Sequence, residues 1–212
     1  MARIKLVDAE VVAASGAGSL RNSTRVTNHA RLYANAPFLT RLLNPFSAAI
    51  QREGLGSVLS CRIKEMVVIK TSHINGCSYC YAHNTAIGEA AGITHEQVLA
   101  IGSDDYMTSP HLSPRERAAV LWAEHVTRNT AKDRDDVFEE VARHFDDTEI
   151  LELTLVCAMF NFTNRVHDSL KLELEPPSQR KAAIKIDPNN MKAFIQKILD
   201  AWPLEFPEPN PD

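Results

Sequence analysis

Long apolar stretches are missing from this 212-residue sequence, although 44% of its residues are hydrophobic. The most apolar segment, residues 150–162, is shorter than the roughly 20 residues that a membrane-spanning helix needs, and it contains Glu152. Near the first residue, Asp8 and Glu10 interrupt what would have to be the apolar core of a signal peptide. We therefore expect a cytoplasmic protein with no membrane as a partner.

Charge of one sign is also scarce. The sequence has 23 basic and 27 acidic side chains, which give a formal net charge of −4, and it contains no long basic run. Surfaces that bind nucleic acid or anionic membranes depend on clusters of Lys and Arg. The composition therefore gives no reason to expect a nucleic acid as a partner.

Patterns typical of β-hairpins are absent, whereas signals that start helices recur. Ser113-Pro114 followed by Glu116 combines an N-cap serine, a proline in the first turn and a glutamate three residues after the cap. This combination predicts a helix that runs to about Arg128. Thr94, with a glutamine three residues later, predicts a shorter helix that ends near residue 102. The sequence is therefore predicted to be all-α.

Three further helices are predicted in the second half of the chain. They cover residues 135–145, residues 148–170 with Asp147 as the cap, and residues 189–202. In the first half, Asn44-Pro45 predicts a boundary between short helices, because proline removes a backbone donor and disfavours helix continuation.

The order of these signals suggests how the chain is organised. Residues 1–58 are predicted to be an N-terminal helical extension packed on a core formed by residues 59–172. Residues 173–212 are predicted to form a C-terminal helix and a proline-rich arm, because four prolines occur after residue 202. We expect the three parts to form one globular domain.

The sequence has four cysteines: Cys61, Cys77, Cys80 and Cys157. A framework of structural disulfides is not expected in a reducing compartment, so the close pair needs another explanation. Asn75-Gly76 is suited to end a helix that begins near Cys61, which places Cys77 at the start of the next helix. Free backbone N–H groups there favour a thiolate, and a spacing of three residues lets the two sulfurs form a disulfide. The pair predicts a redox-active dithiol.

A zinc site and an inert pair of core cysteines are the alternatives. One pair of cysteines supplies two of the four ligands of a structural zinc site, and His73 and His83 form no second pair at a fixed spacing. Glu65, on an apolar helical run, favours a chemical role, because a buried carboxylate needs a partner or a function. Equally, Glu65 can be a surface residue paired with Lys64 or Arg62.

The arrangement of Glu65, Cys77 twelve residues later, and Cys80 resembles the alkylhydroperoxidase and carboxymuconolactone decarboxylase family. Further stretches that match the family or its peroxidase-related members are residues 74–80 (INGCSYC), 90–94 (AAGIT), 112–117 (LSPRER) and Asn164-Arg165. The resemblance covers about residues 40–172. It implies an orthogonal all-α bundle of about eight to ten helices, assembled as a homo-oligomer, either a trimer or a hexamer.

The resemblance also implies a function, the reduction of small hydroperoxides without an organic cofactor or a metal. Cys80 then attacks the peroxide, Cys77 resolves the product as a disulfide, and an external dithiol reductant restores the pair. Glu65 heads a proton relay that reaches the cysteines through a histidine. The alternatives are a lyase like the family's decarboxylases, which generally lack the cysteine pair, and a non-catalytic redox-sensing oligomer.

The histidine of the relay departs from the family pattern. It is expected four residues after the second cysteine, where this sequence has Asn84, whereas His83 comes one residue earlier. At about 100° per residue, His83 is placed to touch Cys80 but not to bridge both sulfurs. His73 is a conceivable substitute. The helix dipole alone favours Cys77 as the more reactive thiol, in disagreement with the role that the family implies.

A weak internal similarity connects two distant parts of the chain. A shift of 87 residues places His167 on Cys80, and nearly places Asn164 on Cys77, within two apolar helical segments that are each led by a glutamate. Internal duplication and chance alignment are equally good explanations. For Asn164 and His167 we expect a structural role in helix packing rather than a place opposite the cysteines.

Overall fold

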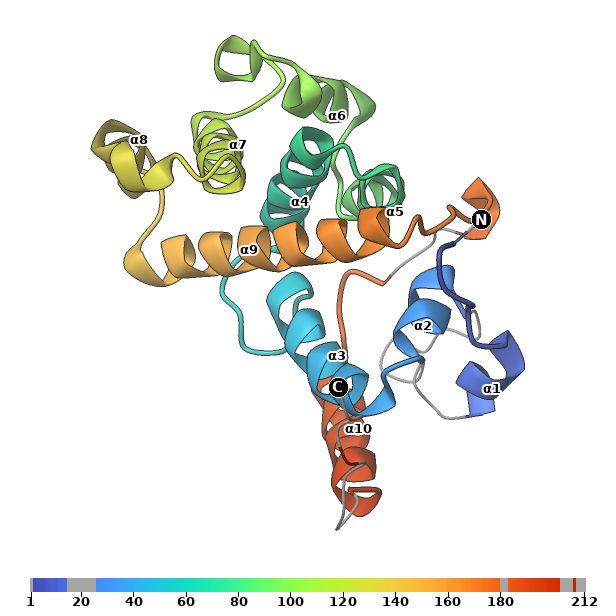
Figure 1. Ribbon diagram of the computed structural model, residues 1–212. Coiled ribbons are helices and arrows are strands. Elements are labelled where there is room, and N and C mark those ends of the chain that lie inside the picture. The colour runs from blue at the N-terminus through green and yellow to red at the C-terminus, as the bar shows by residue number, and fades with distance from the viewer. Residues whose placement is uncertain (1, 15–25, 180–182, 203–207, 209–212) are drawn as a thin grey trace.

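A computed structural model of the chain describes residues 2–14, 26–179, 183–202 and 208. In these residues it contains ten α-helices and no β-strand, apart from an isolated parallel bridge between Glu53 and Lys185. The predicted all-α class is thus confirmed (Figure 1). Of the predicted proline-rich tail, residues 203–207 and 209–212 lie outside the described residues.

The helices follow one another along the chain with short connections. Their bounds are α1 Ala9–Ala14, α2 Asn28–Tyr33, α3 Pro37–Gln51, α4 Cys61–Asn75, α5 Ser78–Ala90, α6 His95–Gly102, α7 Pro114–Thr127, α8 Asp135–Ala142, α9 Asp147–Ser169 and α10 Pro188–Asp200.

The centre of the fold is α4, which packs against α5, α7 and α9 (Figure 1). The four consecutive side chains from Met66 to Ile69 are all 0% exposed. Consecutive residues point to different sides of a helix, so α4 is covered on every side rather than on one face. The long helix α9 runs across α4 and brings its C-terminal end towards α5 (Figure 1).

The connection between α4 and α5 positions the two cysteines. Gly76 ends α4 with a φ of 72°, a left-handed conformation that glycine adopts without the steric penalty of a Cβ atom. Cys77 then serves as the N-cap of α5, and its Sγ accepts the backbone N–H of Cys80 at 3.4 Å. The predicted helix end and the predicted position of Cys77 are confirmed.

Most predicted caps are present, with small corrections. Ser113 begins α7 and Thr94 begins α6 with complete capping boxes. The cap of α9 is Asp146 rather than Asp147, because Asp146 accepts the N–H of Glu149 and the Glu149 side chain reaches back to the N–H of Asp146. Helix α8 ends at residue 142, three residues before the predicted end.

The predicted boundary at Asn44-Pro45 is wrong, since α3 continues through Pro45. Proline leaves the carbonyl of Arg41 without its usual helical donor. Packing offsets this loss, because Ala48 is 1% exposed and belongs to a small hydrophobic cluster completed by α10. The division into an extension, a core and a C-terminal arm stays a prediction.

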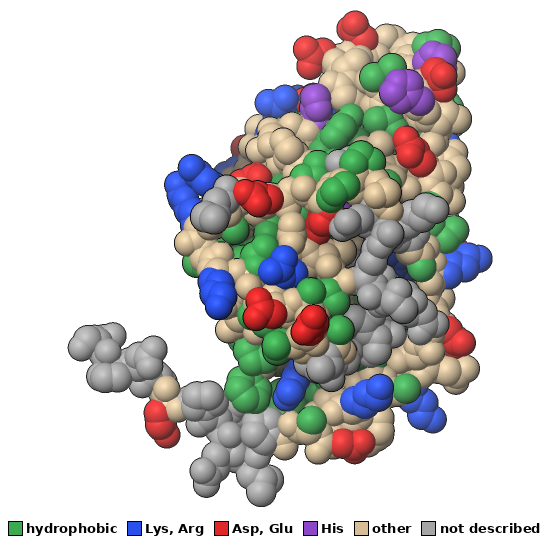
Figure 2. Space-filling model, turned by 90° about the vertical axis from the view of Figure 1, so that its right-hand side faces the viewer, with side chains coloured by type: hydrophobic (Ala, Val, Ile, Leu, Met, Phe, Trp, Pro, Cys, Tyr) green, Lys and Arg blue, Asp and Glu red, His purple; other side chains and the backbone are tan. Residues whose placement is uncertain are grey.

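The charges are distributed without a concentrated patch of one sign. On the face shown in Figure 2, Lys and Arg side chains are interspersed with Asp and Glu side chains around patches of hydrophobic ones. Among the described helices, none has the length and apolarity that crossing a membrane requires.

Candidate active site at the dithiol

Both cysteines of the pair are free thiols in the interior. Cys77 is 0% and Cys80 is 2% exposed. They share a hydrophobic cluster with Leu32 of α2, Tyr79 of α5 and Leu172, which follows α9. Segments from both ends of the chain therefore cover the sulfurs, and a reactant reaches them only after this cover moves.

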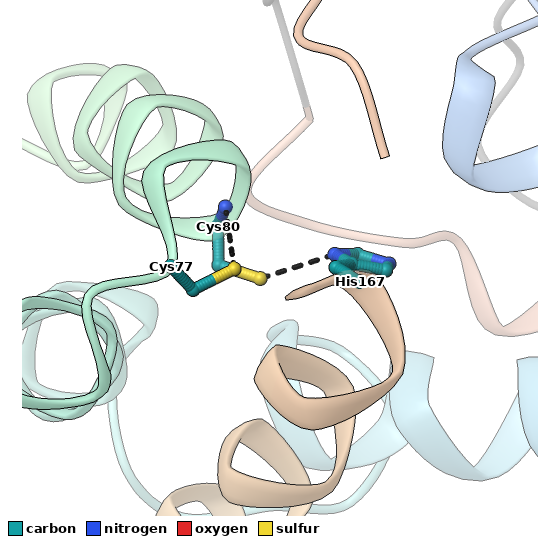
Figure 3. A group of neighbouring side chains, drawn as sticks. All are labelled: Cys77, Cys80 and His167. Carbon is teal, nitrogen blue, oxygen red and sulfur yellow. Dashed lines mark hydrogen bonds between the residues drawn. The ribbon is translucent and has the colours of Figure 1, made fainter. Parts of the chain in front are cut away.

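The sulfur of Cys80 lies 3.1 Å from Nδ1 of His167 (Figure 3). His167 comes from the last turn of α9 and is 3% exposed. Burial lowers the pKa of His167 to about 4, and the nearby His83 adds to this effect. The imidazole is therefore neutral at pH 7 and has an unprotonated nitrogen that can accept a proton from the thiol.

The two thiols have different surroundings. Hydrogen bonding with Cys77 and burial both raise the pKa of Cys80, so its resting form at neutral pH is the thiol. The sulfur of Cys77 accepts a backbone N–H at the start of α5, which favours negative charge on that sulfur. The structure thus joins Cys80 to an imidazole and Cys77 to a helix N-terminus.

A second imidazole continues the chain of contacts from Cys80. Nε2 of His167 lies 2.9 Å from Nδ1 of His29, a half-buried residue of α2. The ring of His29 also packs against that of Tyr33, with centroids 4.4 Å apart. Cys80, His167 and His29 therefore form a continuous polar chain that leads from the buried sulfur towards the surface.

A buried carboxylate holds the surrounding polar groups. Glu175 accepts the hydroxyl of Tyr79 at 3.0 Å, Nε2 of His83 lies 2.7 Å from its other oxygen, and the backbone N–H of Asn28 also donates to it. The Tyr79 hydroxyl in turn accepts the backbone N–H of His29 at 3.2 Å. Although burial opposes ionisation, the bonds from His83 and Asn28 hold the pKa of Glu175 below its usual value.

The predicted site residues separate into two groups. Cys77 and Cys80 lie together, whereas the imidazole of His83 pairs with Glu175 and it is His167 that contacts the sulfur of Cys80. His73 is exposed and packs near Tyr81. A catalytic role for His83 stays a prediction.

Glu65 is fully buried, with its carboxylate 2.9 Å from Nη1 of Arg52. The side chain of Gln51 donates both to Glu65 at 3.0 Å and to Asn84 at 2.7 Å. The Asn84 amide then donates to the backbone carbonyl of Cys80 at 2.6 Å. This route connects Glu65 with the backbone of the cysteine rather than with its sulfur, and the proposed relay function of Glu65 stays a prediction.

Metal binding is limited by the number of donors. Cys77, Cys80 and His167 place one donor atom each within 4.8 Å of one another, and among the described residues this group contains three members. A structural zinc site uses four protein ligands. The donor set is therefore one ligand short of such a site, whereas it contains everything that a dithiol reaction with a base requires.

Sequence analysis missed the roles of His167 and His29 at the dithiol. For His167 a signal was present, because the shift of 87 residues that places His167 on Cys80 joins two side chains that are in contact. Asn164, which the same similarity places near Cys77, accepts a hydrogen bond from Asn75 at 2.9 Å beside the pair. For His29 no pattern in the sequence points to the cysteines.

Comparison with known proteins identifies related sequences and folds. Residues 38–125 match the model of the carboxymuconolactone decarboxylase family. The uncharacterized protein YdfG of Bacillus subtilis is 27% identical over 104 residues, which cover 49% of this chain and 69% of YdfG.

Two solved structures share the fold at low sequence identity. The first is a peroxidase-related protein of Ralstonia eutropha JMP134 with an alkylhydroperoxidase AhpD core, which is 19% identical with a TM-score of 0.69 and covers 86% of this chain and 98% of its own. The second is a variant of the debrominase Bmp8 in complex with 2,3,4-tribromopyrrole, which is 18% identical with a TM-score of 0.62 and covers 93% and 100%.

Proposed function

The chain belongs to the carboxymuconolactone decarboxylase family through residues 38–125 and has an AhpD-like fold, and we propose that it is a thiol-dependent hydroperoxidase. The observation that supports this proposal most directly is the 3.1 Å contact between Sγ of Cys80 and Nδ1 of His167, next to the sulfur of Cys77. A nucleophilic thiol, a base in contact with it and a resolving thiol are the three groups that peroxide reduction requires.

In the first step the thiol of Cys80 loses its proton to the neutral imidazole of His167. The thiolate attacks the distal oxygen of the hydroperoxide, the O–O bond breaks, and the electron pair leaves with the alkoxide. The alkoxide takes up a proton and departs as an alcohol, or as water when the substrate is hydrogen peroxide. Cys80 is left as a sulfenic acid.

In the second step the sulfur of Cys77 attacks the sulfur of the sulfenic acid. The S–S bond forms, the S–O bond breaks, and hydroxide leaves and takes up the remaining proton as water. The position of Cys77 at the N-cap of α5 supports this role, because the backbone N–H of Cys80 favours its thiolate. An external dithiol then reduces the disulfide and becomes oxidised itself.

The surroundings of the pair bear on the substrate and the assembly. The sulfurs lie among apolar and aromatic side chains, which suits a small hydroperoxide rather than a polymer. Leu39, Leu42 and Phe46 of α3 are 71%, 56% and 52% exposed, and such surfaces commonly mark contacts between subunits. We propose that the protein forms a homo-oligomer and acts in the cytoplasm.

The test is a count of free thiols after exposure of the purified protein to peroxide, with disulfide mapping by mass spectrometry. We expect the loss of two thiols per chain and a bond between Cys77 and Cys80. Cys80→Ser should abolish turnover, and Cys77→Ser should stop at the sulfenic acid, which a dimedone probe detects. The matched control is Cys61→Ser, which removes another buried thiol and should leave turnover unchanged.

A second set of variants identifies the base. His167→Gln should lower the rate of peroxide-dependent thiol loss about 100-fold, the scale on which a positioned base acts. If His83→Gln or Glu65→Gln causes the larger loss, the relay passes through those residues and the assignment of His167 is overturned.

Other results point to the alternative functions. No loss of thiols at millimolar peroxide excludes the peroxidase. Turnover of a lactone substrate by the variant that lacks both cysteines indicates the lyase. Disulfide formation in a single event, without turnover in the presence of dithiol, indicates a redox sensor. Stoichiometric zinc by elemental analysis, together with protection from peroxide, indicates the metal site.

A further inference from the structure

The polar chain that begins at Cys80 does not end on His167 but on the imidazole of His29. The sulfur of Cys80 lies 3.1 Å from one nitrogen of His167, and the other nitrogen of that ring lies 2.9 Å from Nδ1 of His29. We propose that His29 is a positioning residue that fixes the tautomer of His167 and takes up the proton that Cys80 releases. This inference rests on the proposed function and deepens it.

The donors and acceptors of the chain fit a single arrangement when Cys80 is a thiol that donates to His167. A neutral imidazole carries one N–H and one acceptor nitrogen. When the thiol donates to Nδ1 of His167, the hydrogen of that ring is on Nε2 and donates to Nδ1 of His29. The hydrogen of His29 is then on its own Nε2, and both contacts have one donor and one acceptor.

Release of the proton reverses both hydrogen bonds. Nδ1 of His167 receives the proton of Cys80, and the hydrogen on Nε2 of His167 passes to Nδ1 of His29. His167 remains neutral in its other tautomer and now donates to the thiolate. One proton has moved in net terms from the sulfur to His29, which becomes an imidazolium, and no atom is gained or lost.

The two imidazoles differ in how well they can hold a positive charge. His167 is 3% exposed, and burying an unpaired charge is costly, whereas His29 is half-buried on α2 and nearer to water. The carboxylate of Glu175 accepts the N–H of Asn28, the residue before His29, and the hydroxyl of Tyr79, which accepts the N–H of His29. Negative charge on Glu175 therefore favours an imidazolium at His29 over one at His167.

The titratable groups around the pair come from every element packed against it. They are Tyr33 on α2, Tyr79 and His83 on α5, Asp168 on α9, and Glu175 in the segment that follows α9. Of these, His83 disfavours a charge on His167 and Glu175 favours it. Because α2 lies outside residues 38–125, the second imidazole is supplied by a part of the chain that the family model does not match.

The experiment measures the thiolate of Cys80 in the full chain without using peroxide. In a Cys77→Ser background, the rate of alkylation of Cys80 by iodoacetamide is followed against pH by peptide mass spectrometry. We expect His29→Ala and His29→Gln to move the midpoint upward by about one pH unit or more, which lowers the rate at neutral pH about tenfold. Glutamine accepts the bond from His167 but takes up no proton, so an unchanged midpoint in His29→Gln overturns the proposal.

The matched control is Leu32→Ala, which loosens the packing of the same helix and leaves the imidazole in place. We expect it to change the alkylation rate by the same factor at every pH, with the midpoint unmoved. A shift as large as that of His29→Gln would show that docking of α2, not its histidine, sets the midpoint, and would overturn the proposal. Absence of peroxide-dependent thiol loss in the wild type would instead refute the proposed function, which this readout does not use.

Discussion

Arg52 and Glu65 form an ion pair with a 2.9 Å contact, in which the two side chains are 1% and 0% exposed. Gln51 donates a further hydrogen bond to the same carboxylate oxygen. The adjacent Lys64 is also fully buried and donates to the carbonyl of Arg52. The carboxylate that the family pattern places at the head of a proton relay thus also connects α4 to the end of α3.

Removal of one partner from this pair should be costly. Arg52→Met leaves the carboxylate of Glu65 buried without its cation, and we expect the free energy of unfolding to fall by about 3–5 kcal/mol. Urea denaturation of the purified variant measures the change.

The double variant Arg52→Met with Glu65→Leu removes both charges and should recover most of the lost stability. Arg143→Ala breaks an ion pair in which the arginine side chain is 67% exposed, and it should have no measurable effect. A double variant as unstable as Arg52→Met alone would contradict this account of the pair.

Gly76 should be sensitive to substitution because of its backbone conformation. A Cβ atom at Gly76 meets no neighbour within 4 Å, so the cost of Gly76→Ala comes from the φ of 72° alone. We expect a loss of about 1–2 kcal/mol, measured by urea denaturation, and a smaller loss for Gly76→Asn. Gly102→Ala is the control, because its Cβ would make an ordinary 3.5 Å contact with His73. Equal losses at the two glycines would argue against a strained position.

Stability should depend on pH through His167. Its pKa in the folded chain is about 4, below the usual histidine value. Between pH 6.5 and pH 4, the unfolded chain binds a proton at this position and the folded chain does not. The free energy of unfolding should therefore fall as the pH is lowered through this window, by an amount on the order of 3 kcal/mol.

The comparison with His167→Gln isolates this contribution, because other groups titrate equally in both proteins. We expect the difference in unfolding free energy between the two proteins to change steadily between pH 6.5 and pH 4 and to level off outside that range. A difference that is independent of pH would contradict the neutral, buried state of His167.

Glu175 should control how firmly α2 covers the dithiol. Glu175→Ala removes the acceptor of Tyr79 and of the backbone of Asn28, and a buried donor left unsatisfied costs about 1–3 kcal/mol. We expect lower stability and faster alkylation of Cys80 at every pH. Glu175→Gln keeps an acceptor oxygen and should show a smaller change in both measurements. Slower alkylation in Glu175→Ala would show that the segment does not act as a cover.

The sequence by itself determined the local features that need a few neighbouring residues. Gly76 ends α4 and Cys77 begins α5 because a left-handed residue and an N-cap depend on backbone geometry within one turn. The capping box at Ser113 and the all-α class were likewise predictable, since helix signals and their spacing are written along the chain.

Only the tertiary structure decided which side chains meet the cysteines. His167 is 87 residues from Cys80 and reaches it because α9 crosses the bundle, and His29 arrives on a helix from before the matched family segment. Periodicity fixes which residues share a face of one helix, but not which helices cross. Pro45 lies inside α3 for the same reason, because burial of Ala48 against α10 outweighs the lost backbone bond.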